Sequence, residues 1–422
     1  MNKKQKIAII GSGISGLSAA YMLHKQHDIA LFEKNDYLGG HSRTIEVPTE
    51  NGKIAVDTGF IVLNHRNYPL LTKLFKEINV KIVKSDMSFG ATIDDGAFEY
   101  GTQHLYNIFA QKSNIFKIKF WRMIYDLFKF QRKAYNYIDA DPTLTLGQCL
   151  DEIGLGEWFR RYFILAMGGA IWSMSLKKML DFPARTFIHF FDNHGLLTIN
   201  DQPQWYTVQG GSREYVKRLT ASFADNIKLN CGVKKVIRES EKVTLIDHHD
   251  QHYDFDQVVF ACHSDQALSM IDNPTEDEHN IIGNMTYSRN QIYVHKDESF
   301  MPKRKAAWAS WVYLLEEKID VRSNMCLSYW MNNLQPLETD TQIFVTLNPA
   351  RKPAEEHLFD EYIFEHPVFD EKAIEAQGRI DGIQGKDRFW FCGAYQRYGF
   401  HEDGLLSSVN MVKKMGIKPN WV

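Results

Sequence analysis

The sequence predicts an α/β fold in which a Rossmann-type domain is interleaved with an α+β domain. Three observations lead to this prediction. The chain has 422 residues, more than one small hydrophobic core usually holds. A βαβ unit occupies its first 33 residues. Farther along, residues 103–165 carry apolar side chains at helical spacing, whereas residues 281–347 alternate as strands do.

The βαβ unit begins with a short apolar run at residues 7–10, which predicts a strand buried on both faces. The glycine-rich segment 11–16 follows directly and leads into a predicted helix at 17–24. A second strand at 28–32 ends in Glu33, twenty residues after the second glycine of the motif. Strand, glycine turn, helix and terminal acid in this order predict a dinucleotide site.

Each residue type in this unit has a physical role. Gly11 permits a tight turn, Gly13 lets the backbone approach a pyrophosphate, and Gly16 lets helix and strand pack closely. The helix N-terminus directs free amides and a partial positive charge at that pyrophosphate. Glu33 is suited to accept hydrogen bonds from the adenosine ribose.

The segment after Glu33 distinguishes FAD from NAD. Gly39, Gly40 and Arg43 follow the second strand closely. Two glycines let the backbone pass near the FAD diphosphate and ribityl chain, and an arginine neutralises phosphate charge. We therefore predict FAD. The alternative interpretation is a glycine turn with a surface arginine.

Composition excludes several classes of protein. Hydrophobic residues make up 44% and charged residues 24%, as in ordinary globular proteins, and this argues against wholesale disorder. The net charge of −3 gives no indication of nucleic acid binding. Five scattered cysteines without a CxxC pair favour reduced thiols in the cytoplasm and argue against a metal site. We find neither a signal peptide nor a membrane span.

The chain resembles the flavin-containing amine oxidase and phytoene desaturase superfamily. Beyond the N-terminal motifs, the resemblance is carried by five further segments, at residues 56–60, 208–219, 227–236, 256–262 and 389–405. It implies that the last of these caps the ribityl chain and the pyrimidine edge of the flavin. Many relatives carry an acid where this chain has Ala394, so we expect Asp403 to supply the ribityl contact.

The motifs and the resemblance together imply a set of cofactor contacts. The predicted residues are Gly11, Ser12, Gly13, Ile14, Ser15, Gly16, Glu33, Lys34, Gly39, Gly40, His41, Ser42, Arg43, Thr58, Gly59, Phe60, Val233, Ala261, Gly393, Asp403, Gly404 and Leu405. The implied FAD-binding domain comprises residues 1–65, 205–265 and 385–422. The substrate domain comprises 66–204 and 266–384, with a helical part at about 103–204 and a sheet part at about 281–347.

A narrower resemblance rests on residues 57–64, 67–69, 85–89, 308–311 and 399–404. These look like a bacterial subgroup of predicted FAD-binding proteins. The subgroup is similar to the flavin module of plant cyclopropane-fatty-acid synthases and to flavoproteins that desaturate acyl chains on the way to furan fatty acids. This resemblance implies a hydrophobic acyl-chain substrate.

A basic, aromatic-rich stretch extends from Lys112 to Lys133. It holds seven lysines and arginines against the single acid Asp126, interleaved with aromatic and aliphatic residues. Such a helix is suited to a membrane interface. The alternative interpretation is a core helix with a solvated basic face. We expect a cytoplasmic protein, either free or attached to the inner face of the membrane.

FAD chemistry requires a site that holds a substrate carbon against the ring, beside one proton acceptor. We predict His401 and Glu402 as candidate acceptors, although either residue is also suited to a structural role at the start of a helix. Trp330, Tyr395 and Tyr398 are the predicted walls of the substrate cavity.

Three hypotheses for function follow from the sequence. The first is an oxidoreductase that dehydrogenates or desaturates a fatty-acyl or phospholipid chain. The second is a flavin amine oxidase that acts on a small amine. The third is a non-catalytic flavoprotein that assists a lipid-modifying methyltransferase.

Overall fold

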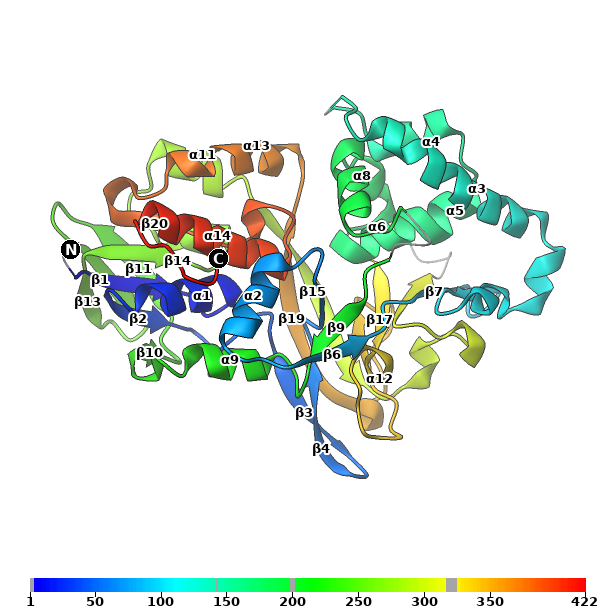
Figure 1. Ribbon diagram of the computed structural model, residues 1–422, viewed down its shortest axis with the longest axis horizontal. Coiled ribbons are helices and arrows are strands. Elements are labelled where there is room, and N and C mark those ends of the chain that lie inside the picture. Colours follow the sequence, from blue (N-terminus) through cyan, green and yellow to red (C-terminus); the bar gives the residue numbers. More distant parts are fainter. Residues whose placement is uncertain (1–3, 142, 173, 198–201, 316–324) are drawn as a thin grey trace.

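The computed structural model describes residues 4–141, 143–172, 174–197, 202–315 and 325–422. Figure 1 shows two lobes. One holds a parallel sheet and both chain termini, and the other combines a larger sheet with a group of helices. The fold is mixed α/β, as the sequence predicts.

The parallel sheet lies at the centre of the first lobe. Its strands, in spatial order, are β10 (Ile227–Lys228), β2 (Asp28–Phe32), β1 (Lys6–Ile10), β14 (Gln257–Phe260) and β20 (Phe389–Phe391). Every pairing in it is parallel. Ile7 and Ile9 enter one hydrophobic core while Ala8 and Ile10 enter another, so β1 is buried on both faces. This double burial explains its unbroken apolar run.

Different layers cover the two faces of this sheet. On one face lie α1 (Ile14–Leu23), α2 (Pro69–Glu77), α9 (Arg213–Thr220) and α14 (His401–Lys414). On the other lie β11 (Val233–Arg238), β12 (Val243–Asp247), β13 (His252–Phe255), α10 (Ser264–Met270), α11 (Glu276–Ile282) and α13 (Glu371–Arg379). The βαβ unit of the sequence is therefore part of a three-layer lobe.

A sheet of seven described strands forms the floor of the second lobe. In spatial order they are β19 (Leu358–Val368), β15 (Thr286–His295), β18 (Phe344–Leu347), β17 (Cys326–Trp330), β16 (Trp311–Leu315), β7 (Phe89–Ile93) and β8 (Phe98–Gly101). The sequence predicts a sheet over 281–347. The structure adds β19 at one edge and β7 and β8 at the other, because the chain returns to this sheet from distant segments.

Two small sheets connect the lobes. One pairs β3 (Thr44–Thr49) with β4 (Gly52–Asp57). The other places β9 (Trp205–Val208) between β5 (Val62–Asn64) and β6 (Ile82–Ser85). The chain therefore passes from lobe to lobe as paired strands, and α12 (Met331–Leu334) follows β17 nearby.

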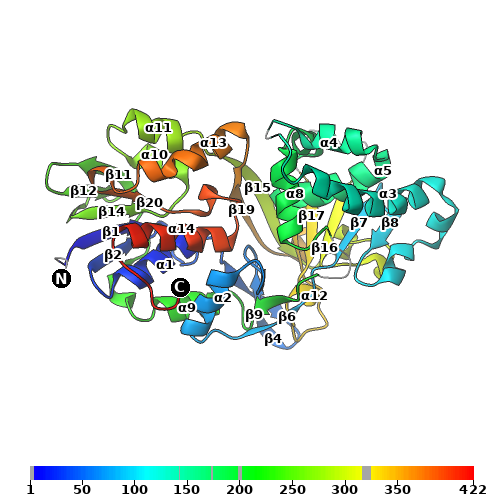
Figure 2. The same ribbon diagram turned by 45° about the horizontal axis from the view of Figure 1, so that its top comes forward.

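Helices cover one face of the larger sheet (Figure 2). They are α3 (Ile118–Ala134), α4 (Leu146–Ile153), α5 (Glu157–Phe159), the π turn η4 (Arg160–Ile164), α6 (Leu165–Trp172), α7 (Leu176–Leu180) and α8 (Ala184–Asn193). The Thr145 hydroxyl accepts a hydrogen bond from the backbone of Gln148 and starts α4, and Gly154 ends it at φ +69°. No helix among the described residues is both long and apolar enough to span a bilayer.

Short 3-10 turns complete the secondary structure. They are η1 (Leu105–Phe109), η2 (Lys112–Phe116), η3 (Tyr135–Tyr137), η5 (Ala224–Asn226), η6 (Glu298–Phe300), η7 (Lys305–Ala307), η8 (Glu355–His357), η9 (Ile380–Gly382), η10 (Lys386–Arg388) and η11 (Ala394–Gln396). The sequence predicts mostly helix over 103–165. The structure begins this region with η1 and η2 and places the first long helix at α3.

Candidate functional site

The glycine loop between β1 and α1 combines close packing with one open position. A Cβ at Gly16 would lie 1.9 Å from the carbonyl oxygen of Gly11, so only glycine fits there. A Cβ at Gly13 would meet nothing within 4 Å. Gly13 is also the N-cap of α1, and no side chain of the described residues caps that turn. Gly13 therefore leaves the N-terminus of α1 without a side-chain cap and with room beside it, as an anion site requires.

Glu33 is fixed at the end of β2. Its Oε2 accepts hydrogen bonds from the backbone amide and hydroxyl of Ser12, at 3.0 and 2.5 Å. Its Oε1 accepts from Asn35. The carboxylate is 6% exposed and lies beside the glycine loop, whereas the neighbouring Lys34 is exposed.

The second glycine pair packs on the first motif. Gly40 has φ +57°, and a Cβ there would lie 3.1 Å from Cα of Gly13. The amide of Gly39 donates to the carbonyl oxygen of Ser12 at 3.0 Å. Two segments that the sequence separates by more than twenty residues therefore form one continuous backbone surface.

Arg43 also has a partner within the protein. Its guanidinium forms an ion pair with Asp360 on β19 at 2.6 Å and lies over the ring of Tyr362, 4.4 Å from the centroid. The carboxylate of Asp360 thus holds the guanidinium in place beside the glycine loop. The partner was not recognisable from the sequence, because β19 lies more than 300 residues away.

A buried network of hydroxyls joins three cofactor segments. Nε2 of His401 lies 3.0 Å from the Ser42 hydroxyl and 2.8 Å from the Tyr215 hydroxyl, and these two hydroxyls also hydrogen-bond each other. The ring of His401 stacks on Phe60, with centroids 3.9 Å apart. Loss of contact with water and, to a smaller extent, the nearby His41 lower the pKa of His401 to about 3. The imidazole is therefore neutral at pH 7.

His41 faces the same region from the glycine loop. Its ring stacks on Phe364 at 4.2 Å, and its Nε2 is buried without a hydrogen-bond partner among the described residues. Burial lowers its pKa to about 4, and nearby His263 adds to this effect. A buried polar atom without a partner is uncommon in proteins, and here it fits a site that receives a polar cofactor.

The strand turn after β4 lies against His41. The amide of Phe60 donates to the carbonyl oxygen of His41, and the amide of Thr58 donates to that of Arg43, so Gly59 lies between two backbone contacts. At the end of β14, next to β1, the amide of Ala261 donates to the carbonyl oxygen of Ile10, and Ala261 packs against Gly11 and Gly16 of the glycine loop.

The other predicted cofactor contacts lie where the chain returns to this lobe. Val233 belongs to the core under β11. The remaining positions are in or near α14. The carbonyl oxygen of Gly404 accepts from the Ser15 hydroxyl at 2.9 Å, and Gly393 donates to the Ser407 hydroxyl. Ile14 and Leu405 are buried in the core between α1 and α14.

The two acids at the start of α14 cap helices. Oδ2 of Asp403 accepts from the amides of Tyr398 and Phe400, at 3.2 and 3.0 Å, within its own turn. Glu402 accepts from the amides of Leu70 and Leu71, at 2.7 and 2.9 Å, and so caps α2. Burial raises the pKa of Glu402 to about 7. Both carboxylates are therefore bound to backbone, and of the two predicted acceptors the geometry favours His401.

Among the three predicted cavity residues, Tyr398 lines a hollow. Tyr398 borders a space between α8, α13 and the turn before α14. The lining residues are Trp172, Phe182, Thr186, Phe369, Ile374, Gln377, Arg397 and Tyr398. Tyr395 is instead 3% exposed and packs in the core beneath the parallel sheet.

Trp330 is directed away from the helices. Trp311 pairs directly with Tyr329 across β16 and β17, and both lie on the face that the helices cover. Successive strand residues point to opposite faces, so Trp330 lies on the other face, where it packs against Trp308. The sequence shows that aromatic residues occur on these strands, but it does not show which of them face the helices. Trp311 and Tyr329 are the aromatic residues of these two strands that face the helices.

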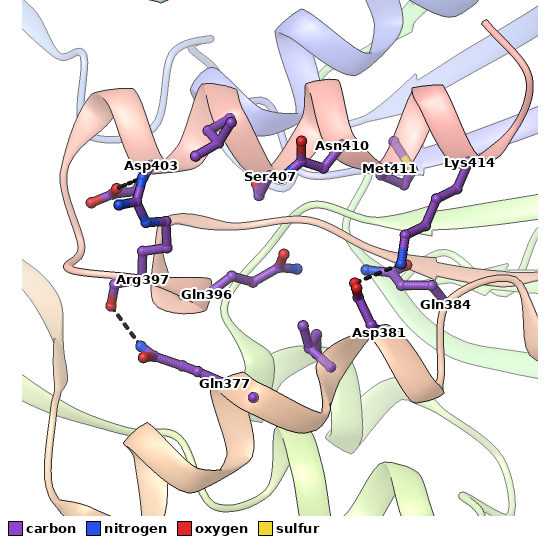
Figure 3. A pocket seen from close by; sticks show the side chains of 13 residues that line it. Gln377, Asp381, Gln384, Gln396, Arg397, Asp403, Ser407, Asn410, Met411 and Lys414 are labelled. Atoms are coloured by element: carbon purple, nitrogen blue, oxygen red, sulfur yellow. Dashed lines mark hydrogen bonds and ion pairs between the residues drawn. The ribbon is translucent and has the colours of Figure 1, made fainter. Parts of the chain in front are cut away.

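A second hollow lies on the other side of Arg397 (Figure 3). It is bordered by α13 and α14, and its lining holds amides and charged groups, with an ion pair between Lys414 and Asp381 at 2.6 Å. No aromatic ring is among its described lining residues, which makes it a poor match for an apolar substrate or a flat ring. Among the described residues, moreover, no three His, Cys, Asp or Glu side chains are placed to hold a metal ion.

The sequence profile described as flavin containing amine oxidoreductase matches residues 14–362. The chain belongs to this family. It is an oxidoreductase whose cofactor is FAD, and both predictions from the sequence are thereby confirmed. The residues around Gly13, Glu33 and His41 fit that cofactor, because they provide an open helix N-terminus, a fixed acid and a buried nitrogen without a partner.

Relatives and solved structures agree with the family. An uncharacterized protein of Methanocaldococcus jannaschii is 27% identical over 264 residues, a match that covers 60% of this chain and 57% of that protein. The fold is similar to a fatty acid isomerase from P. acnes described as CLA-producing (TM-score 0.69, 16% identity, 99% and 100% of the two chains). It is also similar to a putrescine oxidase bound to putrescine, with a TM-score of 0.68 and 14% identity over 98% of this chain and 99% of that chain. At such identities the similarity shows the fold alone.

Proposed function

We propose that this FAD-dependent oxidoreductase dehydrogenates or desaturates an apolar acyl chain that carries an anionic end. The observation that carries the proposal is the lining of the hollow beside Tyr398. Aromatic and aliphatic side chains make up most of it, and its charged lining residue is Arg397. Apolar walls bind a hydrocarbon chain, and a guanidinium attracts a carboxylate or phosphate.

The same lining argues against a small amine. A cationic substrate is stabilised by acids or by aromatic rings free of competing cations. Here no acid lines the hollow among the described residues, and the guanidinium of Arg397 lies 5.4 Å from the ring of Tyr398. Arg397 pairs with Asp403 at 3.6 Å, but Asp403 is not part of this lining, so a cation rather than an acid faces the hollow. This arrangement favours an acyl carboxylate over an ammonium group.

FAD, when bound, supplies a two-electron acceptor for hydride from a substrate carbon. The chain contributes the environment. Trp172, Phe182 and Phe369 give the hollow apolar walls, which favour contact with a hydrocarbon chain. His401 holds a neutral imidazole that contacts the hydroxyls of Ser42 and Tyr215. Its low pKa makes it a weak base, so we assign it the role of passing the substrate proton on through these hydroxyls rather than keeping it.

Anaerobic reduction of the purified flavoprotein tests this proposal. We expect the flavin absorbance to bleach with long-chain fatty acids or their phospholipid esters and to stay unchanged with an amine panel. Bleaching by amines alone would overturn the acyl proposal in favour of an amine oxidase. If neither class bleaches the flavin, the third hypothesis, a non-catalytic partner of a lipid-modifying enzyme, is favoured.

Arg397→Gln sharpens this test. We expect KM for a free fatty acid to rise about tenfold or more, because a charge-assisted contact is lost, with a smaller effect on kcat. Arg218→Gln, on the exposed side of α9, is the matched control. An unchanged KM in Arg397→Gln would exclude the arginine as the anchor of the anionic end.

A further inference from the structure

Helix α3 has two apolar faces, and only one of them is covered. Phe120, Met123 and Phe130 point into the core of the helical layer. On the opposite side of the helix, apolar residues recur at intervals of three and four, so they form one stripe. This second stripe consists of Ile118, Trp121, Tyr125 and Phe128, which are 87%, 49%, 59% and 46% exposed.

The stripe belongs to a larger surface. Of the twelve exposed large hydrophobic side chains among the described residues, ten lie between Leu105 and Tyr135. We call this surface the α3 outer face. It includes Leu105 and Phe116, which are 76% and 84% exposed and project from the turns η1 and η2. Exposed apolar side chains gathered in this way mark an interaction surface rather than ordinary scatter.

Within the range Lys112–Lys133 the exposed charges are of one sign. Seven lysines and arginines lie between Lys112 and Lys133, and the only acid in that range is Asp126. Asp126 is fully buried and is bound by Nε of Arg122 at 2.9 Å and by the amide of Gly156 at 2.8 Å. Its charge is thus withdrawn from the surface, and the exposed charges, including Lys112, Lys119 and Lys133, are positive.

We propose that the α3 outer face docks on a lipid bilayer that carries anionic headgroups. Apolar and aromatic side chains enter the boundary between headgroups and acyl chains, while lysines around them meet the negative surface. Charge complementarity selects this occupant: the basic rim has no exposed acid in the range Lys112–Lys133 to pair with a mixed-charge protein surface.

The position of α3 suits such docking. Figures 1 and 2 place it at the edge of the molecule farthest from the parallel sheet and the chain termini. Docking there leaves the glycine loops and the α14 turn away from the bilayer. The proposal concerns a binding surface alone and holds whichever substrate the flavin oxidises.

Co-sedimentation of the holoprotein with vesicles tests the charge component. We expect binding to phosphatidylglycerol–phosphatidylcholine vesicles and little to pure phosphatidylcholine. Lys112→Glu, Lys119→Glu and Lys133→Glu combined should lower partitioning onto the anionic vesicles by about a hundredfold or more. A control with the same change in net charge, Lys73→Glu, Lys217→Glu and Lys413→Glu on α2, α9 and α14, should bind far better than this variant.

Two double variants test the contribution of the apolar side chains to vesicle binding. Phe116→Ser with Ile118→Ser should lower partitioning by about tenfold or more, because two side chains no longer enter the interface. Leu229→Ser with Ile363→Ser, at exposed apolar positions in other parts of the chain, should leave it within about twofold. Equal melting temperatures of all four variants and wild type would exclude unfolding as the cause.

Two outcomes overturn the proposal. One is wild-type holoprotein that fails to bind anionic vesicles, or that binds as well after the substitutions in the α3 outer face. The other is a dimer in lipid-free solution, detected by light scattering, that dissociates with Phe116→Ser and Ile118→Ser. That dimer would assign the face to a second copy of the chain. Because vesicle binding is measured without turnover, neither outcome depends on the identity of the substrate.

Discussion

The cofactor lobe and the helical lobe use their surfaces in opposite ways. Around the glycine loops, segments far apart in the sequence approach so closely that a Cβ at Gly16 would overlap the Gly11 carbonyl. On the outside of α3, by contrast, Ile118 is 87% exposed and touches little. Backbone contact constrains the first region, whereas side-chain burial alone constrains the second. Small substitutions should therefore be severe in the cofactor lobe, and in α3 their effect should depend on which face they occupy.

The largest expected effect is that of Gly16→Ala. The new methyl group would lie 1.9 Å from a backbone oxygen, and neither helix α1 nor strand β1 can move without disturbing the sheet. We expect a loss of about 4 kcal/mol or more in the free energy of unfolding, or no folded protein. Denaturant unfolding of the apoprotein checks this result.

Gly13→Ala is the matched control. Its φ of −66° accepts alanine, and the added Cβ meets nothing within 4 Å. We expect apoprotein stability within about 1 kcal/mol of wild type but a loss of bound flavin, because the methyl group occupies the approach to the helix N-terminus. Retention of full flavin content by this variant would contradict the placement of the pyrophosphate there.

The sequence predicted the cofactor region well because its constraints are local. A strand, a glycine turn, a helix and an acid within 33 residues fix one backbone geometry, and the structure shows it at Gly13 and Glu33. Partners that come from distant segments were not predictable. Asp360 reaches Arg43 from β19, and Tyr215 reaches His401 from α9. The residues near Arg43 and His401 in the sequence do not indicate these contacts.

Periodicity also left the orientation of elements open. Spacing identified α3 as an amphipathic helix but did not show which of its apolar residues the rest of the protein covers. In the same way, alternation identified β17 as a strand without showing whether Tyr329 or Trp330 faces the helices. A periodic pattern fixes which residues share a face, and only tertiary packing decides which face is covered.

The next effect separates the two faces of α3. Phe120 is fully buried against Phe98 and Phe109. Phe120→Ala should cost about 3–5 kcal/mol, because it removes a large side chain from a packed core and leaves a cavity. Thermal and urea unfolding measure the loss. A cost below about 1 kcal/mol would mean that the helical layer is loosely packed at this position.

A smaller, pH-dependent effect tests the cofactor lobe. Burial lowers the pKa of His401 to about 3 from its ordinary value of 6.5. The folded protein therefore binds fewer protons at this residue than the unfolded chain. The contribution of neutral His401 to the free energy of unfolding is present above pH 6.5 and is lost as the pH falls toward 3. By pH 5 the loss from this one group reaches about 2 kcal/mol.

His401→Gln should remove that component. The amide still hydrogen-bonds to the hydroxyls of Ser42 and Tyr215 but has no proton to gain. Between pH 7 and pH 5 the unfolding free energy of both proteins changes. The decrease in His401→Gln should be about 2 kcal/mol smaller than the decrease in the wild type. Glu402, whose pKa burial raises to about 7, opposes the trend equally in both proteins and cancels. His279→Gln, exposed on α11, is the control and should follow wild type.

The smallest expected effect completes the comparison within one segment. Phe116 lies four residues before Phe120 and is the same residue type, yet it is 84% exposed where Phe120 is 0% exposed. Phe116→Ala should change the free energy of unfolding by no more than about 0.5 kcal/mol, because the ring stays in contact with water in the folded protein and folding buries little of its surface. The same unfolding measurement, made beside Phe120→Ala, checks it. A cost for Phe116→Ala close to that for Phe120→Ala would show that another part of the chain covers the α3 outer face in solution, and that this face is core rather than a surface for binding.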